Sequence, residues 1–323
     1  MYNYNGIPLQ NYGLVHGRAP GSNIALSGFL DMPARLGKTH HDWSDELGTQ
    51  PYVLASEIYH GGRDITYHGF IKAADRRDAI QKANDLYTDL SKLTDLAPLE
   101  TSWGTFSVYI REAVRAEYLR DGYARLAITF REPVVTKPVD IPTGSSVALY
   151  NMDNVNYRDL GAFVTRIDDN FNRPATKEAN FRAYGVEGYQ VTRMAPLEIT
   201  HDLFFKSATY AGLKANVEKF HAMLAAPGTR IMNIDNMERE CFSKDGFRVE
   251  NIRVTSTQAI CQLSVRLVMV GAGVPVPPEY LLDHLGEPVL DVIEPIRTPE
   301  EDNFLLDERG YNILTDKTEK LTQ

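Results

Sequence analysis

Apolar residues recur along the first half of the chain with helical spacing and then with a two-residue spacing. The segment 57–73 looks extended. From about Asp75, apolar residues follow at steps of three and four, which puts them on one helical face; they are Ala79, Ile80, Ala83, Leu86, Tyr87, Leu90 and Leu93. Asp75 is the expected N-cap, and Pro98 marks a limit after the helix.

Two strands with one apolar face are predicted after this helix. In the first, Phe106, Val108 and Ile110 alternate with less apolar neighbours, and in the second Leu126, Ile128 and Phe130 do the same. A period of two indicates half-exposed antiparallel strands. Asp121-Gly122 between them is typical of a type I′ hairpin, because both central residues of that turn need a positive φ.

The same order of patterns returns later in the chain, 134 positions on. The run from Ile65 to Ala74 (ITYHGFIKAA) resembles the run from Ile199 to Ala208 (ITHDLFFKSA), with Ile, Thr, Phe, Lys and Ala in place. The same spacing pairs other positions: Phe29-Leu30 with Phe163-Val164, Leu86 with Phe220, and Leu90 with Leu224. An internal repeat is therefore expected.

The second repeat reads as strand, helix and strands again. Residues 197–206 look extended, and a helical stripe ends at Pro227-Gly228; the stripe consists of Leu213, Val217, Phe220 and Leu224. Asp245-Gly246 is expected to be a turn between strands at 237–241 and 247–254, and residues 263–269 alternate as a last strand. The predicted fold class is α+β, mostly β: two tandem repeats of an antiparallel β-sandwich or split barrel, each with one packed helix.

These patterns predict five segments. They are an extended N-terminal arm (1–27), a first domain (28–133), a linker rich in Pro, Gly and Ser (134–156), a second domain (157–271) and a Pro-rich acidic C-terminal arm (272–323). The C-terminal arm also carries interspersed apolar residues, which favours an arm that orders on a neighbouring subunit; a disordered tail is the alternative.

Composition narrows the class of protein. Hydrophobic residues make up 43% of the 323 residues and charged residues 24%, as in globular proteins that bury a core. The net charge of −9 argues against binding to nucleic acid or to an anionic membrane. It is explained by solubility or, alternatively, by an acidic channel wall past which DNA slides.

Localisation follows from the absence of targeting patterns. No apolar run approaches the ~20 residues of a membrane span, and the first residues have neither the basic start nor the apolar core of a signal peptide. Synthesis and folding in a cytosol are expected. Cys241 and Cys261 lack zinc-ligand spacing, and Cys261 is expected to be a buried free thiol.

No catalytic, cofactor or metal site is predicted. Gly61-Gly62-Arg63-Asp64 precedes a strand and is expected to be a turn, because a phosphate site needs a helix N-terminus. His40-His41-Asp42 is expected in a loop, and Asp168-Asp169 in a turn or cap. Trp43 and Trp103 are each isolated, and Trp43 is expected to anchor a loop.

The first repeat resembles the N-terminal domain of bacteriophage distal tail proteins. The likeness lies in Gly61 to Thr66, the helix after it, the strand from Gly104 to Tyr109, and the run from Leu126 to Pro133. It covers roughly residues 11–133, and 157–270 more weakly. It implies a tail-tube-like fold and a ring, usually a homohexamer, between the tail tube and the baseplate hub or fibre. It brings no catalytic residues.

The chain departs from that family because its second half repeats the first, where many members carry a carbohydrate-binding domain. Three chains could form a pseudo-sixfold ring, as in trimeric baseplate hub proteins, or six chains a wider ring or two layers. The implied partners are further copies of the chain, the tail tube protein and the hub or fibre protein, with DNA passing through unbound. The implied location is the virion tail, assembled in the host cytoplasm.

Two other functions compete with the tail ring. One is a receptor- or sugar-binding module, which needs exposed aromatic side chains; the candidates are Tyr150, Tyr157, Tyr184 and Tyr189, which core packing explains equally well. The other is an enzyme with an unrecognised site, such as Asp168 and Asp169.

Overall fold

The computed structural model describes most of the chain: residues 2–42, 49–92, 95–119, 122–146, 148–168, 176–183, 186–234, 237–271, 305–306 and 312–313. It separates into two compact units, Met1–Val274 and Pro275–Gln323. In the second unit only the antiparallel pair β21 (Leu305–Leu306) and β22 (Asn312–Ile313) is described. The rest of the expected C-terminal arm lies outside the described residues.

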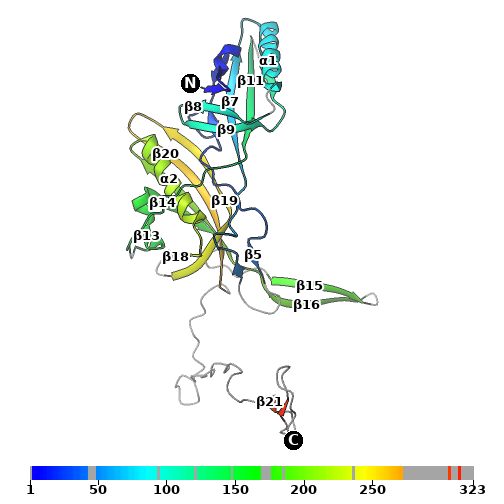
Figure 1. Cartoon of the computed structure of the whole chain (residues 1–323), viewed down its shortest axis with the longest axis vertical. Coiled ribbons are helices and arrows are strands. Elements are labelled where there is room, and N and C mark those ends of the chain that lie inside the picture. Colours follow the sequence, from blue (N-terminus) through cyan, green and yellow to red (C-terminus); the bar gives the residue numbers. More distant parts are fainter. Residues whose placement is uncertain are drawn as a thin grey trace. The chain divides into compact units, whose positions relative to one another are not determined.

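The first repeat is an antiparallel sheet with one long helix (Figure 1). Its strands follow the order β2-β1-β8-β9-β11-β7-β3, while β10 pairs with β11 and β4 with β7. The elements are β1 (Tyr2–Tyr4), β2 (Ile7–Pro8), the 3-10 helix η1 (Leu9–Tyr12), β3 (Leu14–His16), β4 (Leu26–Ser27), β5 (His40–His41), β6 (Gln50–Pro51), β7 (Arg63–Lys72), α1 (Arg76–Ser91), β8 (Ala97–Thr101), β9 (Gly104–Ile110), β10 (Arg115–Tyr118) and β11 (Tyr123–Glu132).

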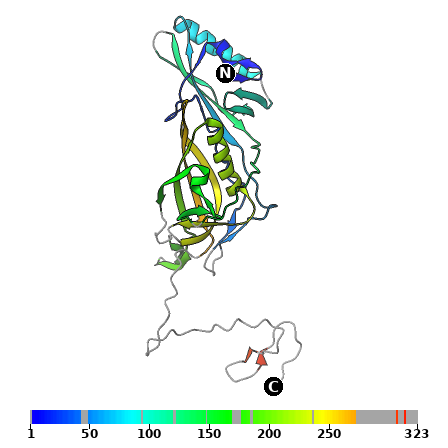
Figure 2. The same cartoon turned by 90° about the vertical axis from the view of Figure 1, so that its left-hand side faces the viewer.

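The second repeat has the same path through its sheet, β13-β12-β18-β19-β20-β17-β14, and its own helix (Figure 2). A further hairpin of β15 and β16 forms a separate two-stranded sheet. The elements are β12 (Tyr150–Met152), β13 (Val155–Asn156), η2 (Tyr157–Leu160), β14 (Ala162–Asp168), β15 (Thr176–Ala183), β16 (Val186–Met194), β17 (Glu198–Ser207), α2 (Tyr210–Ala225), β18 (Arg230–Ile234), β19 (Met237–Val254) and β20 (Ala259–Met269). The identical order confirms the predicted duplication and the mostly β, α+β class.

The first elements of each repeat are displaced by 148 positions, whereas the helices keep the 134 positions seen in the sequence. Gly13 and Gly161 end η1 and η2, and α1 and α2 begin at Arg76 and Tyr210. Val15 is therefore the counterpart of Phe163. The expected match of Phe29-Leu30 with Phe163-Val164 is wrong, because the repeats differ in length between their first and later strands.

The N-terminal segment is not an extended arm. β1 pairs with β8 through Asn3 and Glu100, and β3 pairs with β7 through Val15 and Phe70, so both belong to the first sheet. Likewise β12 and β13, placed in the predicted linker, begin the second sheet. Strands of two or three residues are too short to show a period, so only their tertiary pairing reveals them.

The helix α1 starts at the predicted cap, and α2 is capped in the same way. The Asp75 carboxylate accepts a 2.8 Å hydrogen bond from the Asp78 N–H, and the Thr209 hydroxyl accepts one of 3.1 Å from Gly212. The apolar stripe of α1 faces the core except at Ile80, which is 38% exposed and lies outside the buried face. Leu93 lies outside the described residues, and Pro227-Gly228 follows the end of α2 as expected.

The two Asp-Gly pairs behave differently. Gly122, at φ 76°, precedes β11 and closes a hairpin between β10 and β11; Asp121 lies outside the described residues. Asp245-Gly246 is not a turn, because β19 runs through it as one strand with a bulge between Ser243 and Phe247. Local sequence favours a turn here, but pairing of both flanks with the single strand β20 keeps the chain extended.

Candidate assembly interface

A strap from the first repeat, residues 19–35, runs along the half of β19 that β18 leaves free. At one end the N–H groups of Ile252 and Val254 donate to Ser22 Oγ (3.0 Å) and Asn23 Oδ1 (2.9 Å). The Asn23 amide returns a 2.7 Å bond to the Val254 carbonyl. Short polar side chains therefore satisfy backbone groups of a strand edge in the other repeat.

The other end of the strap pairs with β19 more like a strand. Met32 and Phe247 exchange backbone hydrogen bonds of 3.0 and 3.2 Å, and Asp31 Oδ1 accepts a 2.8 Å bond from the Val249 N–H. Burial raises the Asp31 pKa to about 6, against the lowering effect of the Val249 bond and of Arg63. The strap thus joins the two repeats through both backbone and side chains.

Gly246 explains why β19 bulges where the strap arrives. Its φ is 67°, and a Cβ added there would lie 2.1 Å from the Met32 carbonyl oxygen and 2.7 Å from that of Pro33. Only glycine combines this backbone conformation with so close an approach. The Asp-Gly pair is therefore fitted to the crossing strap rather than to a hairpin.

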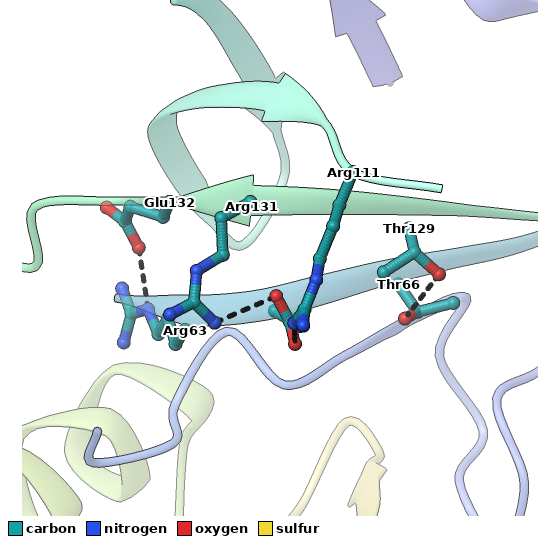
Figure 3. Close-up of polar contacts among 7 residues, drawn as sticks. Arg63, Thr66, Arg111, Thr129, Arg131 and Glu132 are labelled. Atoms are coloured by element: carbon teal, nitrogen blue, oxygen red, sulfur yellow. Dashed lines mark hydrogen bonds and ion pairs between the residues drawn. The ribbon is translucent and has the colours of Figure 1, made fainter. Parts of the chain in front are cut away.

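Arg63 lies at the junction of the strap, the first sheet and α2. Its Nε donates to Glu132 Oε2 at 2.6 Å, in a pair whose side chains are 14% and 10% exposed. Its Nη1 lies 3.4 Å from the Asp31 carbonyl oxygen, and its guanidinium is 5.6 Å from the Phe106 ring centre. Figure 3 shows Arg63 and Glu132 reaching each other from neighbouring strands, β7 and β11.

A second ion-pair group lies next to it on the same two strands. Asp64 pairs with Arg131 at 3.0 Å and with Arg111, and Thr66 and Thr129 face each other at 3.4 Å (Figure 3). These residues, Arg111 apart, line an open groove of about 1070 Å³ between the repeats, which also has Asp202 and Arg266 in its wall. Its charges are of both signs, as in a packed interface rather than in a site that concentrates one charge.

Trp103 ties the first sheet to the start of α2. Its ring meets Tyr210 edge-on at 4.8 Å between centres, and the Tyr210 hydroxyl donates to the Trp103 carbonyl at 3.0 Å. Trp103 Nε1 donates to the Tyr2 hydroxyl at 2.9 Å. The residue that looked isolated in sequence is thus a contact between repeats.

Two histidines also meet across this junction. The ring centres of His60 and His221 are 6.4 Å apart, and among the described residues no hydrogen-bond partner meets His60 Nδ1, His60 Nε2 or His221 Nε2. Burial lowers the pKa of His60 to about 4, helped by Lys137 and Arg35. Burial lowers that of His221 to about 3, helped by His60, Arg63 and Lys137.

The remaining sequence candidates do not converge on a site. His40 and His41 form β5, which pairs with β6. Asp168 ends β14 and pairs with Arg166 at 2.7 Å. Among the described residues, no group of three or more His, Cys, Asp or Glu side chains is arranged to hold a metal ion. Trp43, Asp169 and Tyr184 lie outside the described residues.

The tyrosines proposed as a sugar platform belong to the core where they are described. Tyr157 is 1% exposed, and Tyr150 is partly buried against the core. The side chain of Tyr189 is not described. Cys241 and Cys261 are buried free thiols, as expected for Cys261, and burial raises the pKa of Cys261 to about 12. In the described part of the chain, no helix is long and apolar enough to cross a membrane.

The edges of both sheets offer places for further strands. β2 and β3 end the first sheet and β13 and β14 the second, so each pairs on one side only within the described residues. Val15 on β3 is 49% exposed and its counterpart Phe163 on β14 is 44% exposed. Unpaired edges with exposed apolar side chains are sites at which sheets extend.

One solved structure resembles this chain over most of its length. No family model matches the sequence, and no curated protein matches it. The crystal structure of the SPP1 Dit (gp 19.1) protein, described as a paradigm of hub adsorption apparatus in Gram-positive infecting phages, aligns over 83% of this chain and 97% of its own. The TM-score is 0.32 and the identity 9%. A likeness of this size identifies neither a fold family nor a function.

Proposed function

We propose that this protein is a structural subunit of a bacteriophage tail that closes a ring at the distal end of the tail tube. The observation that carries the proposal is the duplicated sheet: two repeats with one strand order, fixed to each other by the strap. Such a chain is a pair of equivalent building blocks. Its role is mechanical, and no catalytic residue is assigned.

The strap supports this role because it makes the pair of repeats stiff. It hydrogen-bonds to β19 from Val254 to Phe247, and Arg35 N–H continues the contact to the Lys244 carbonyl at 2.9 Å. A ring needs a defined angle between successive blocks, since small errors accumulate around the circle. A tethered but loose pair would not provide that angle.

The free edges offer surfaces for contacts between chains. The outermost strands carry exposed Val15 and Phe163, and pairing of such edges continues a sheet from one subunit to the next. Such head-to-tail contacts close into a ring when the rotation between subunits is a simple fraction of a circle. Three chains then give six repeats in pseudo-sixfold symmetry, and six chains give twelve repeats or two layers.

The proposed partners are the tail tube protein on one side and the hub or fibre protein on the other. DNA would pass through the ring without specific binding, in keeping with the acidic net charge of −9. A trimeric baseplate hub is the alternative within the same class.

Immunogold labelling of intact phage particles tests the proposal. Antibodies raised against the folded chain should place gold at the tail end far from the capsid, and empty tails should be labelled at the same point. Label along the whole tail would indicate a tube protein, and label on fibres alone a receptor-binding module. Either result, or unlabelled virions, would overturn the proposal.

A further inference from the structure

In each repeat, the chain leaves the sheet after an equivalent strand, β3 or β14, and returns to it at β7 or β17. We call this segment the excursion of the repeat, and it differs between the two repeats. In the first repeat, the chain between β3 and β7 forms the strap and continues along the second repeat, where the Thr49 N–H donates to the Val270 carbonyl at 2.9 Å. In the second repeat, the chain between β14 and β17 forms the β15–β16 hairpin, which extends away from its sheet in Figure 1. One excursion has its docking site within the chain. The other pairs only with itself among the described strands.

The docking site of the strap is the outer edge of β19 from Phe247 onward. On its inner side this stretch pairs with β20, with Val249 opposite Leu263. On its outer side the strap supplies Met32, Asp31 and Ser22. The edge of one repeat is therefore closed by the excursion of the repeat before it.

The first repeat has a counterpart of this edge in β10. Both stretches pair with the strand that follows them, and their sequences match: Val114-Arg115-Ala116-Glu117 corresponds to Phe247-Arg248-Val249-Glu250. Both also pair with the same stretch of the following strand: β10 pairs with β11 beyond the part that β9 pairs with, and the stretch from Phe247 pairs with β20 beyond the part that residues 241–243 pair with. β10 is thus the place where an excursion from a preceding repeat would dock.

The outer side of β10 is largely open. The Leu119 N–H bonds to the Tyr123 carbonyl, so alternation along the strand turns the backbone groups of Ala116 and Tyr118 outward. Tyr87 of α1 lies beside the Ala116 backbone, at the position where Asp31 of the strap accepts the Val249 N–H in the second repeat. In the described part of the chain, no strand or loop pairs with the remaining outward groups, and Leu119 and Tyr123 beside them are 44% and 42% exposed.

We infer that the β15–β16 hairpin of one chain docks on the outer edge of β10 in a second copy of this chain. Around a ring of repeats, each excursion then reaches the next repeat: the strap does so within a chain, and the hairpin does so between chains. The inference rests on the proposed ring and specifies its contact. It gives the hairpin the same mechanical task that the strap performs on β19.

A photo-crosslinking experiment identifies the occupant of β10. Leu119 is replaced by p-benzoylphenylalanine in the full chain, and the purified protein is irradiated and digested. The expected result is a crosslink between two chains, with the partner peptide inside residues 176–194. A partner peptide from residues 272–323, or from any segment of the same chain, overturns the inference.

A matched control uses the edge that is already occupied. The same probe at Glu250 on β19 should crosslink within one chain, to the strap at residues 19–35. This control shows that the chain is folded and that the probe reports edge contacts, so that a negative result at Leu119 counts against the inference.

Removal of the hairpin separates this inference from the proposed function. Thr176 and Met194 pair across its base, so a link of about four residues can replace it. The variant should stay folded, with the Glu250 crosslink intact, but its mass should fall to that of one chain. If the variant keeps the mass of the wild-type oligomer, the inference fails and the ring stands. If the wild-type chain is itself a monomer, both fail.

Discussion

Gly13 and Gly161 occupy one position in the two repeats. Each ends a 3-10 helix in the left-handed region, with φ of 68° and 62°. Each accepts, through its carbonyl, the N–H of a lysine at the end of a long strand: Lys72 at 2.8 Å and Lys206 at 2.9 Å. This equivalence in backbone conformation and hydrogen bonding shows that the duplication extends to single residues.

Alanine at either glycine should destabilise the chain by a similar amount, roughly 1–3 kcal/mol. The new Cβ would lie 2.7 Å from the Lys72 carbonyl oxygen in one case and 2.5 Å from that of Lys206 in the other. Urea unfolding of Gly13→Ala and Gly161→Ala measures the change. Gly6→Ala is the control, because its φ is 74° but no atom lies within 4 Å, so it should cost only about 1 kcal/mol. A large effect at only one of the two sites would contradict their equivalence.

Removing the Asp31 carboxylate should loosen the strap. Asp31→Ala leaves the Val249 N–H without its 2.8 Å partner, and a buried donor left unpaired costs about 1–3 kcal/mol. Asp31→Asn keeps an acceptor oxygen and should cost less. Limited proteolysis should cut residues 19–35 of Asp31→Ala faster than those of the wild type. Asp140→Ala, at an exposed ion pair, is the control for loss of a carboxylate.

Removing one partner of the Arg63–Glu132 ion pair should lower the free energy of unfolding more than replacing both partners does. Glu132→Leu leaves the Arg63 charge unpaired near the junction of the repeats and should cost about 3–5 kcal/mol. The double variant Arg63→Met/Glu132→Leu should recover much of that loss, because no unpaired charge remains. Thermal unfolding of the three proteins gives the coupling. Glu117→Ala breaks an exposed pair with Arg125 and should change stability by less than about 0.5 kcal/mol.

Stability should fall in mild acid because of the buried histidines. His60 and His221 have folded-state pKa values of about 4 and about 3, below the ordinary 6.5, so the unfolded chain binds protons more readily. Their contribution is complete above pH 6.5 and is lost as the pH falls toward 4. Asp31, with its raised pKa of about 6, works in the opposite direction over part of this range.

Urea unfolding at pH 7 and pH 5 measures this effect. His221 alone should account for roughly 1–2 kcal/mol of the loss. His221→Leu should flatten the pH profile relative to the wild type, although it also changes packing against Phe247. An unchanged profile in that variant would show that His221 does not govern the acid response.

The sequence predicts those parts of the fold that local pattern determines. The helical stripe with its Asp75 cap, the alternation around Ile128 and the match of Ile65 with Ile199 all predict elements that the structure contains. The repeat itself could be found because the helices keep one spacing. The fold class follows from these elements alone.

The junction between repeats could not be predicted because it depends on tertiary contacts. Ser22 and Asn23 lie far in sequence from Ile252 and Val254, and no local period marks a residue that caps a distant strand edge. At Gly246 the local sequence gives a wrong prediction. Its Asp-Gly context favours a turn, but the glycine is needed because the strap passes close to it at Met32. Arg63 could not be recognised for the same reason, since its partners come from the strap, β9 and β11.

The mass of the purified chain in solution, measured by light scattering behind a sizing column, tests the ring most directly. Rings are closed homo-oligomers, so the mass should be an integer multiple of the 36.3 kDa chain, about 109 kDa for three copies or about 218 kDa for six. The first value means that the duplicated sheet gives pseudo-sixfold symmetry, and the second that it gives true sixfold symmetry. A mass of 36.3 kDa at every concentration would contradict the ring.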